Sequence, residues 1–342
     1  MDWFERITGF AETDWHSTRE RLSVEGTDLV SLVNGTRHGV GTFEVPTLCT
    51  MRARARRELA SKQTLVECVV GDARALHADP RLAGATFQVA SQFNALEMVS
   101  PDVSPEDGVT RYAFDRTQGP ACAIAAGGAT IWRNYFLPLD GDGRVTGQTA
   151  TRQLDTLAGL GTALADRLGV SVQTLWSMRN GYALATAQGL REIGRLLSGA
   201  SEDERDTLRG KLAVAWQRNA EVTDAMPGER PRVSQVFCSA LPVAYTSIAP
   251  VVWEPLARLV LEAAYEATLL AAAEQHVAGG SSTVLLTRLG GGVFGNRDIW
   301  IDDAILRALS LVADDGLDVK LVSFGHHHPS FRRIAAAWPS RD

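Results

Sequence analysis

Two groups of residues in this sequence have side chains and spacing that could bind an anion or transfer a proton. The first is the run at 289–296, LGGGVFGN, in which four of the eight residues are glycine. The second is an acidic stretch that contains Asp102, Glu106, Asp107 and Asp115. Two carboxyl groups enclosed together can differ in pKa and can then divide the general acid and general base roles. Asp107 and Asp115 are our first candidates for these roles and Asp102 is the third; the alternative is a solvated acidic loop with a turn after Asp107.

The glycine-rich run lies between a strand-like segment and a helix-like one. Glycine tolerates positive φ, so successive N–H groups can form a concave anion site, and the next helix N-terminus adds partial positive charge. Phosphate is the natural guest of such a site. No Gly-Lys-Ser/Thr follows the run and its spacing is not GxGxxG, which excludes a P-loop and a Rossmann fingerprint. A tight turn without a ligand is the alternative. The candidate binding residues here are Gly290, Gly291, Gly292, Val293, Phe294, Gly295 and Asn296.

An alternation of strands and helices must hold these residues in place. Short β-branched runs predict strands at 64–70, 85–90, 233–238, 283–287 and 319–324. Apolar spacing and capping patterns predict helices at about 154–168, 201–221, 253–273 and 301–313. We interpret the block from about 149 to 225 as an all-helical insertion and residues 1–61 as an N-terminal extension. An α/β fold, with sheet strands flanked by helices, is therefore expected over 62–335.

The composition is that of an ordinary globular protein. The chain has 342 residues, of which 45% are hydrophobic, and its formal net charge is −6. This acidic balance argues against broad binding to nucleic acid or to an anionic membrane. A basic patch, Arg52, Arg54, Arg56 and Arg57, is interpreted as a solvated helix face. The charged first residues do not resemble a signal peptide and no segment could span a membrane, so we expect a cytoplasmic protein.

No group of residues has the spacing of a metal site. The four cysteines include no CxxC pair. His326-His327-His328 would need ligands from other segments, because neighbouring residues of an extended chain point in different directions. We interpret these histidines as a cap on the end of the last strand. We therefore expect no metal and no cofactor.

The sequence also resembles a known family. Gly-Gly-Val-Phe-Gly-Asn at 291–296 looks like the second diphosphate loop of macrodomains, commonly Gly-Val-Phe-Gly or Gly-Ile-Phe-Gly. VVGD at 69–72 resembles the strand end where that superfamily places an adenine-contacting aspartate, and GPACAIA at 119–125 resembles the first loop with its helix. Residues 87–94 occupy the place of the Val-Asn-Ala-Ala-Asn strand, although the Asn-Ala-Ala-Asn sequence itself is absent. The resemblance covers roughly 62–330 and implies a three-layer α/β/α fold with a mixed central sheet.

A finer likeness concerns the segment from 94 to 135. PEDGVT at 105–110, Asp115 and TQGPACA at 117–123 are similar to the MavL-type ADP-ribosylarginine hydrolases, a divergent macrodomain branch. This resemblance implies removal of ADP-ribose from arginine on a protein, with acidic residues ahead of the first loop. Tyr182, beside a helix break at 180–181, could border the adenosine, and packing at the break is the alternative. Besides the glycine-rich run, the ligand-binding residues implied are Asp72, Asn94, Gln118, Gly119 and Tyr182.

The implied reaction would cleave the bond between the ribose anomeric carbon and a guanidinium nitrogen. Positive charge develops on the ribose, and a carboxylate stabilises it while an acid or a positioned water completes the step. Carboxylates also bind a guanidinium group through two hydrogen bonds. The expected partners are ADP-ribose and an ADP-ribosylated protein, with a ubiquitin-like protein as one candidate.

Two other functions remain open at this point. A non-catalytic reader of ADP-ribose would need the glycine-rich cradle but not the carboxylates. A hydrolase of another linkage would act on an ester or on poly(ADP-ribose). For the polymer, the Gly-Gly-Gly with paired glutamates of poly(ADP-ribose) glycohydrolases is not recognisable in this sequence.

Overall fold

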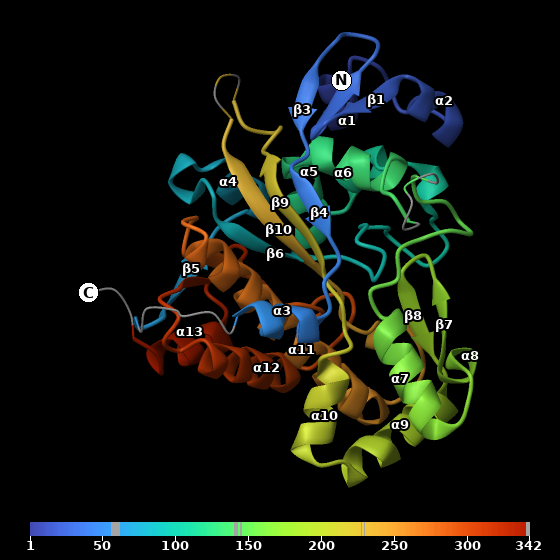
Figure 1. The fold of residues 1–342 in the computed structure, drawn as a ribbon, viewed down its shortest axis with the longest axis vertical. Coiled ribbons are helices and arrows are strands. Elements are labelled where there is room, and N and C mark those ends of the chain that lie inside the picture. The colour runs from blue at the N-terminus through green and yellow to red at the C-terminus, as the bar shows by residue number, and fades with distance from the viewer. Residues whose placement is uncertain (56–61, 140–142, 144–145, 227, 229, 340–342) are drawn as a thin grey trace.

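A mixed seven-stranded sheet forms the centre of the molecule (Figure 1), with strand order β4-β9-β10-β6-β11-β12-β5. The computed structural model describes residues 1–55, 62–139, 143, 146–226, 228 and 230–339. Strands β10, β6, β11, β12 and β5 run parallel, while β9 is antiparallel to β10 and β4 is antiparallel to β9. The bounds are β4 Thr42–Glu44, β5 Leu65–Val70, β6 Thr86–Ala90, β9 Ala215–Glu221, β10 Arg232–Cys238, β11 Thr283–Leu286 and β12 Asp318–Ser323.

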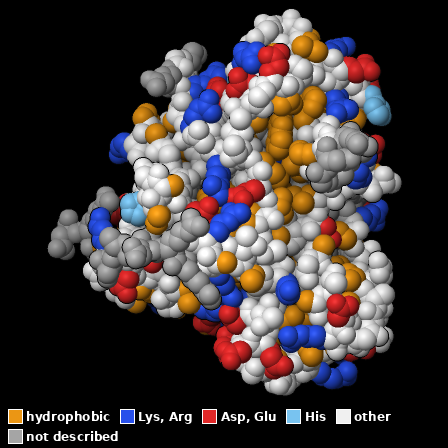
Figure 2. Space-filling view, in the orientation of Figure 1, with side chains coloured by type: hydrophobic (Ala, Val, Ile, Leu, Met, Phe, Trp, Pro, Cys, Tyr) orange, Lys and Arg blue, Asp and Glu red, His pale blue; other side chains and the backbone are white. Residues whose placement is uncertain are grey.

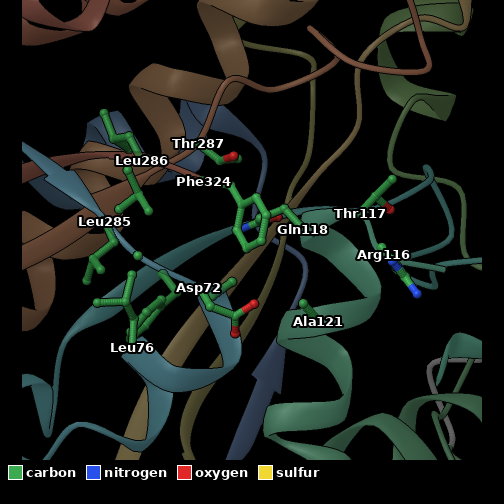
Figure 3. A pocket seen from close by; sticks show the side chains of 14 residues that line it. Asp72, Leu76, Arg116, Thr117, Gln118, Ala121, Leu285, Leu286, Thr287 and Phe324 are labelled. Carbon is green, nitrogen blue, oxygen red and sulfur yellow. The ribbon is translucent and has the colours of Figure 1, made fainter. Parts of the chain in front are cut away.

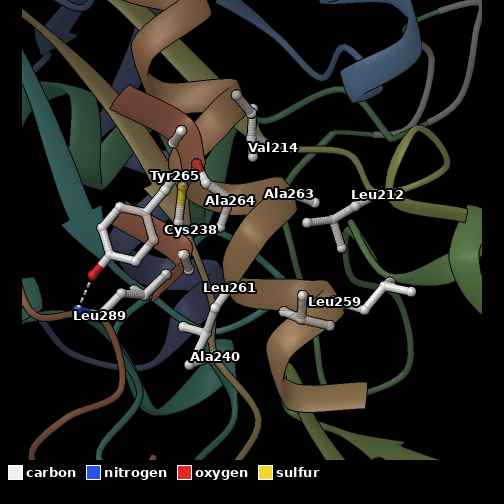
Figure 4. Packing of buried hydrophobic residues seen from close by; sticks show 14 of the residues in the cluster. Leu212, Val214, Cys238, Ala240, Leu259, Leu261, Ala263, Ala264, Tyr265 and Leu289 are labelled. Carbon is white, nitrogen blue, oxygen red and sulfur yellow. Dashed lines mark hydrogen bonds between the residues drawn. The ribbon is translucent and has the colours of Figure 1, made fainter. Parts of the chain in front are cut away.

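Helices cover both faces of this sheet. One face carries α3 (Leu48–Ala55), α11 (Pro250–Val277), α12 (Asp298–Leu311) and α13 (Pro329–Ala336), and the other carries α4 (Ala73–Ala78), α5 (Gln118–Ala125) and α6 (Gly127–Tyr135). Side chains alternate along the strands as a two-faced sheet requires. Val284 and Leu286 pack with α11, whereas Leu285 packs with Phe87 on the opposite face. Figure 4 shows α11 packed against Cys238 and Ala240 at the end of β10.

The predicted α/β fold class and mixed central sheet are confirmed. All five predicted strands are present, as β5, β6, β10, β11 and β12, and the helices predicted at about 253–273 and 301–313 are α11 and α12. The part of the chain that the structure describes contains no helix long and apolar enough to cross a membrane. On the face drawn in Figure 2, acidic and basic side chains are interspersed, and apolar side chains gather in a band in the upper half.

The predicted helix over 201–221 is wrong in its second half. Helix α10 (Glu202–Arg209) ends at Gly210, and Ala215–Glu221 forms β9. The strand is more stable than a helix here because it hydrogen-bonds to β10 on one side and to β4 on the other, and because it buries Trp216 and Ala220.

The insertion is also not all-helical. It contains α7 (Ala158–Leu168), α8 (Val172–Leu175) and α9 (Ala187–Gly199), but β7 (Trp176–Arg179) and β8 (Tyr182–Ala185) form a hairpin between α8 and α9. Asn180 and Gly181, with φ of 46° and 78°, make its two-residue turn. Asn-Gly is the preferred sequence for a turn with both φ angles positive, so the pair that suggested a helix break is a hairpin signal.

The N-terminal segment packs into the same body as the sheet. It begins with α1 (Trp3–Thr8) and α2 (Trp15–Glu20), continues through the small sheet β1 (Leu22–Glu25), β2 (Asp28–Ser31) and β3 (Arg37–Gly39), and then adds β4 to the edge of the central sheet.

The interpretation of the basic patch as a solvated helix face is wrong for its two described members. Arg52 pairs with Asp206 and the buried Glu266, and Arg54 pairs with Glu44. Arg52 therefore joins α3 to α10 and α11. Arg56 and Arg57 lie outside the described residues.

The start of α5 lies so close to β6 that only glycine fits at position 119. A Cβ there would lie 1.9 Å from the carbonyl oxygen of Ala90 and 3.2 Å from Cγ of Glu97. We expect Gly119→Ala to lower the free energy of unfolding by about 1–3 kcal/mol, the usual effect of overpacking. Urea unfolding measures this, and Gly199→Ala is the control.

A Cβ at Gly199 meets nothing within 4 Å, so the control removes a helix glycine without a clash. It should be neutral or stabilising by about 0.5–1 kcal/mol. Equal unfolding midpoints for Gly119→Ala and the wild type would show that α5 does not approach β6 this closely.

Candidate functional site

The candidate site begins where two parallel strands separate. Strands β6 and β11 pair only at Thr86 and Phe87 and then diverge. Beyond that point the side chain of Gln118 replaces the missing strand: its Nε2 donates to the carbonyl of Gln88 (2.8 Å) and its Oε1 accepts from the N–H of Ala90 (2.9 Å). A crevice at the carboxyl ends of parallel strands is where ligands bind in open α/β sheets.

A small apolar pocket of about 100 Å³ lies on one side of this crevice. Figure 3 shows it with Asp72 at the start of α4, Ala121 on α5 and Phe324 after β12. The carboxylate of Asp72 accepts hydrogen bonds from the N–H groups of Arg74 and Ala75, which caps α4, while the ring of Phe324 is largely exposed. The apolar walls are Leu76, Phe87, Leu285, Leu286 and Val322.

A larger cleft of about 470 Å³ adjoins the apolar pocket. Its walls are the chain after β6 (90–92 and 97–99), the segment 114–118 before and at the start of α5, and the glycine-rich run. The cleft and the apolar pocket form one continuous depression, because they share Arg116, Thr117, Gln118 and Thr287.

The glycine-rich run presents backbone donors to the cleft. Gly290 and Gly295 both have φ of 71°, and a Cβ at these positions would lie 2.4 Å from Cβ of Ala240 and 2.8 Å from Cβ of Ala244. The side-chain amide of Asn296 fastens the run by donating to the carbonyl of Leu241 (2.8 Å). Four residues of the run that line the cleft have a backbone N–H group without an acceptor among the described residues: Gly290, Gly292, Val293 and Phe294.

The remaining residues of the run serve its own conformation. The N–H of Gly291 donates to Arg288 and that of Gly295 donates to Gly292. Tyr265, on α11, fixes the entry to the run: its hydroxyl accepts from the N–H of Leu289 (2.9 Å) and donates to the carbonyl of Thr287 (2.7 Å), as Figure 4 shows for the first bond.

Further positive groups face the run from the opposite wall. The N–H groups of Gln118 and Gly119, at the start of α5, have no acceptor among the described residues, as expected for a helix N-terminus. Arg116 is exposed, lines both cavities and has no acidic partner in the part of the chain that the structure describes. The cleft therefore carries partial and full positive charge on two facing walls, which favours an anionic guest.

Glu97 is a buried carboxyl group in the same cleft, and the sequence interpretation did not include it. Its residue is 2% exposed, and neither carboxylate oxygen has a hydrogen-bond partner among the described residues. Burial raises the pKa of Glu97 to about 8, although the guanidinium of Arg133, 3.8 Å away, acts in the opposite direction. Glu97 therefore keeps its proton at neutral pH and can donate it. The signal available in the sequence was a single carboxylate within the apolar stretch 93–99.

Asp115 lines the mouth of the same cleft, and its carboxylate accepts from the N–H of Thr117 (2.8 Å). The other two candidate acids lie elsewhere. The carboxylate of Asp107 accepts from the N–H and hydroxyl of Ser104 (2.8 and 3.0 Å) and caps a 3₁₀ turn. Asp102 is exposed and pairs with Arg179 at 2.5 Å. Neither Asp107 nor Asp102 lines the cleft.

Among the other predicted ligand-binding residues, Tyr182 lines the cleft and Asn94 does not. The hydroxyl of Tyr182 donates to the carbonyl of Met98 (2.6 Å), and its ring packs against Tyr245 and Phe294 at centroid distances of 5.4 and 5.5 Å. Asn94 is buried and holds the turn after β6.

His328 begins α13, where its Nδ1 accepts from the N–H of Ser330. The described residues include no cluster of three or more side chains suited to a metal ion.

The N-terminal segment supports the two candidate acids of the cleft. Glu12 accepts hydrogen bonds from the N–H groups of Val109 and Thr110 (2.9 and 2.6 Å), at the start of the 3₁₀ turn that precedes Asp115. In the same turn, the hydroxyl of Tyr112 accepts from the N–H of Glu97 (3.1 Å). Residues far apart in the sequence thereby set the positions of Glu97 and Asp115.

No family model and no curated protein matches the sequence. Among solved structures, the poly(ADP-ribose) glycohydrolase of Thermomonospora curvata is 13% identical with a TM-score of 0.48, and the match covers 91% of this chain and 93% of that chain. The structure of that protein bound to the inhibitor ADP-HPD is 14% identical with a TM-score of 0.46, and the match covers 91% of this chain and 93% of that chain. The poly(ADP-ribose) glycohydrolase of Deinococcus radiodurans in complex with ADP-ribose is 12% identical with a TM-score of 0.46, and the match covers 86% of this chain and 94% of that chain. This likeness concerns the arrangement of helices and strands.

The raised pKa of Glu97 makes a prediction about stability. Since the folded pKa is about 8 and the ordinary value is 4.5, the unfolded chain loses this proton at a lower pH than the folded protein does. The contribution of this group to stability is complete below pH 4.5 and is lost as pH rises to about 8, by about 1.4 kcal/mol per unit of pKa difference. Glu97→Gln should therefore gain stability relative to the wild type over that range.

Urea unfolding at about pH 5 and about pH 8.5 measures the difference between the two proteins. Glu192→Gln, at a half-buried position on α9, is the matched control and should show no such trend. A stability difference for Glu97→Gln that stays constant between the two pH values would mean that Glu97 is ionised in the folded protein.

Proposed function

We propose that this protein is an ADP-ribosyl hydrolase with a macrodomain-like binding site, and that residues 62–335 form its binding domain. The observation that carries the proposal is the coexistence, in one cleft, of two facing walls of unpaired backbone donors and a buried, protonated carboxyl group. A site that only binds an anion needs the backbone donors but not the buried carboxyl group. A protonated carboxyl group without a protein partner suits a proton donor.

The shape of the depression suits ADP-ribose. The adenine would occupy the apolar pocket between Phe324 and Asp72, and the diphosphate would lie between the glycine-rich run and the start of α5, near Arg116. The distal ribose would then reach Glu97 and Asp115 in the cleft. The structures of similar architecture include glycohydrolases bound to ADP-ribose and to ADP-HPD, which is consistent with this ligand.

In the proposed reaction, the bond between the anomeric carbon of the distal ribose and its substituent breaks. Glu97 donates its proton to the leaving atom, and the carboxylate of Asp115 stabilises the positive charge that develops on the ribose. A water molecule then adds its hydroxyl to the anomeric carbon, and its second proton restores Glu97. For arginine as the leaving group, Asp115 and the exposed ring of Tyr245 offer a carboxylate and a π-system to the guanidinium group.

We infer that mono-ADP-ribosylated arginine on a protein is the substrate, in keeping with the resemblance of residues 94–135. Poly(ADP-ribose) is the second candidate, because the similar solved structures are poly(ADP-ribose) glycohydrolases. A reader without activity is the third. The cytoplasmic location expected from the sequence stays a prediction.

Binding is the first test. Excess free ADP-ribose should raise the melting temperature of the wild type through ligand linkage, and adenosine should do much less because it lacks the diphosphate. Gly292→Glu should remove this shift, since its carboxylate would enter the anion site. A Cβ at Gly292 meets nothing within 4 Å, so the variant should fold.

Gly292→Ala and Gly292→Gln are the matched controls. Alanine tests the loss of glycine, and glutamine tests the bulk without the charge. Gly295→Glu is unsuitable because φ is 71° there and Cβ of Ala244 is 2.8 Å away. An undiminished ADP-ribose shift in Gly292→Glu would place the diphosphate elsewhere.

Catalysis is the second test. Glu97→Gln and Asp115→Asn should each lower release of ADP-ribose from mono-ADP-ribosylated arginine by about 10²-fold or more, while binding of free ADP-ribose falls far less. Asp102→Asn, outside the cleft, is the control and should stay near wild-type turnover. Activity should decline as pH rises through about 8, because Glu97 then loses the proton that it donates.

Each other outcome points to a different function. Binding without turnover on any linkage supports the reader. Turnover on poly(ADP-ribose) or on an ester, with none on arginine, keeps the hydrolase and rejects the arginine assignment.

A further inference from the structure

The mouth of the cleft is surrounded by exposed apolar side chains. Val99, Phe114, Tyr245 and Val293 all line the cleft, and all four belong to the sixteen exposed large hydrophobic residues of the described chain. They come from four separate segments, so the gathering results from the tertiary structure. We call these four residues the apolar rim.

The apolar rim extends beyond what the proposed ligand can cover. Phe114 is 86% exposed although it lines the cleft, so most of its ring faces outward. In the proposed binding mode the adenine lies beside Phe324 in the apolar pocket, so stacking with the base does not account for the exposed ring of Phe114. Exposed apolar surface beside a binding site is typical of contact with another macromolecule.

Two members of the apolar rim, Val99 and Phe114, are close in sequence to the candidate acids of the cleft. Val99 follows Glu97 by two residues and Phe114 directly precedes Asp115. The adenine end, at the apolar pocket, is lined by other residues. In the proposed binding mode, the group attached to the distal ribose would leave the cleft near Val99 and Phe114.

We propose that the apolar rim binds the modified protein itself, through aliphatic or aromatic residues next to the ADP-ribosylated side chain. This inference rests on the proposed function and narrows its substrate class to a protein with apolar neighbours at the modified position. A poly(ADP-ribose) chain fits this surface less well, because each of its units brings further phosphates and no apolar side chain. The rim thus adds selectivity for the protein that the ADP-ribose site alone cannot supply.

The test uses three substrates that share one linkage: free ADP-ribosylarginine, a peptide ADP-ribosylated on arginine with leucine on both sides, and the same peptide with serine instead. The wild type should cleave the leucine peptide with a kcat/KM about 5- to 10-fold above that of the serine peptide, as expected for one well-packed apolar contact. Phe114→Ser should remove this preference through KM, and Val99→Ser should reduce it. Both variants should lose less kcat/KM on free ADP-ribosylarginine than on the leucine peptide, because the lost apolar contact is with the peptide.

Met226→Ser is the matched control, because Met226 is 85% exposed and lines neither cavity. It should leave all three substrates unaffected. Equal losses on free ADP-ribosylarginine and on the leucine peptide would assign Phe114 to the ADP-ribose site and overturn the proposal. Equal kcat/KM of the wild type on both peptides would overturn it as well.

The proposal can fail separately from the proposed function. If the wild type cleaves none of these substrates, hydrolysis of arginine-linked ADP-ribose fails. The affinities of the two uncleaved peptides, measured by calorimetry, then still decide whether the apolar rim prefers leucine. A preference for poly(ADP-ribose) over both peptides would show that the rim does not select a protein.

Discussion

The two hydrogen bonds from the side chain of Gln118 to the backbone of β6 are the interaction on which the site depends. They satisfy the carbonyl of Gln88 and the N–H of Ala90 at the point where β11 turns away. Buried backbone groups left without partners would destabilise the sheet, so the strands can separate only because this amide replaces the missing neighbour. The same contact draws the start of α5 against β6, where Gly119 leaves no room for a side chain. One residue thus opens the crevice and places a helix N-terminus on its wall.

The opposite wall of the cleft is the glycine-rich run, and different contacts hold it in place. The glycine-rich run has two positive φ angles, and it is fastened by Asn296 from within and by Tyr265 from α11. Backbone carbonyls accept from the N–H groups of Gly291, Gly295 and Asn296, whereas the N–H groups of Gly290, Gly292, Val293 and Phe294 have no acceptor among the described residues. The free donors are therefore a consequence of how the run is held, and they need no rearrangement before an anion can bind.

Glu97 is the most costly feature of the site. A carboxyl group buried without a hydrogen-bond partner lowers stability, and the structure offsets this only by keeping the group protonated and by placing Arg133 at 3.8 Å. Arg133 is itself fully buried and stacks on Phe237, with its guanidinium carbon 3.9 Å from the ring centroid. Such an arrangement is hard to explain by packing alone, because leucine or methionine would fill the space without this cost. The N-terminal segment contributes through Glu12, which fixes the turn that holds Tyr112 against the backbone of Glu97.

The sequence alone determined the five parallel strands of the central sheet, because β-branched runs such as 64–70 and 319–324 are local patterns that the parallel sheet preserves. It also indicated the glycine-rich run as an anion site, since glycines between a strand and a helix can adopt positive φ and form a concave turn. It did not determine β9: a segment with helical spacing became a strand because two neighbouring strands offered it hydrogen bonds. It could not separate Asp115 from Asp107, eight positions apart, since only the folded loop turns one carboxylate to the cleft and the other to Ser104. Glu97 was missed for the same reason: a pKa depends on which atoms surround a carboxyl group, and α5, Arg133 of α6 and Tyr112 meet around Glu97 only after the chain has folded.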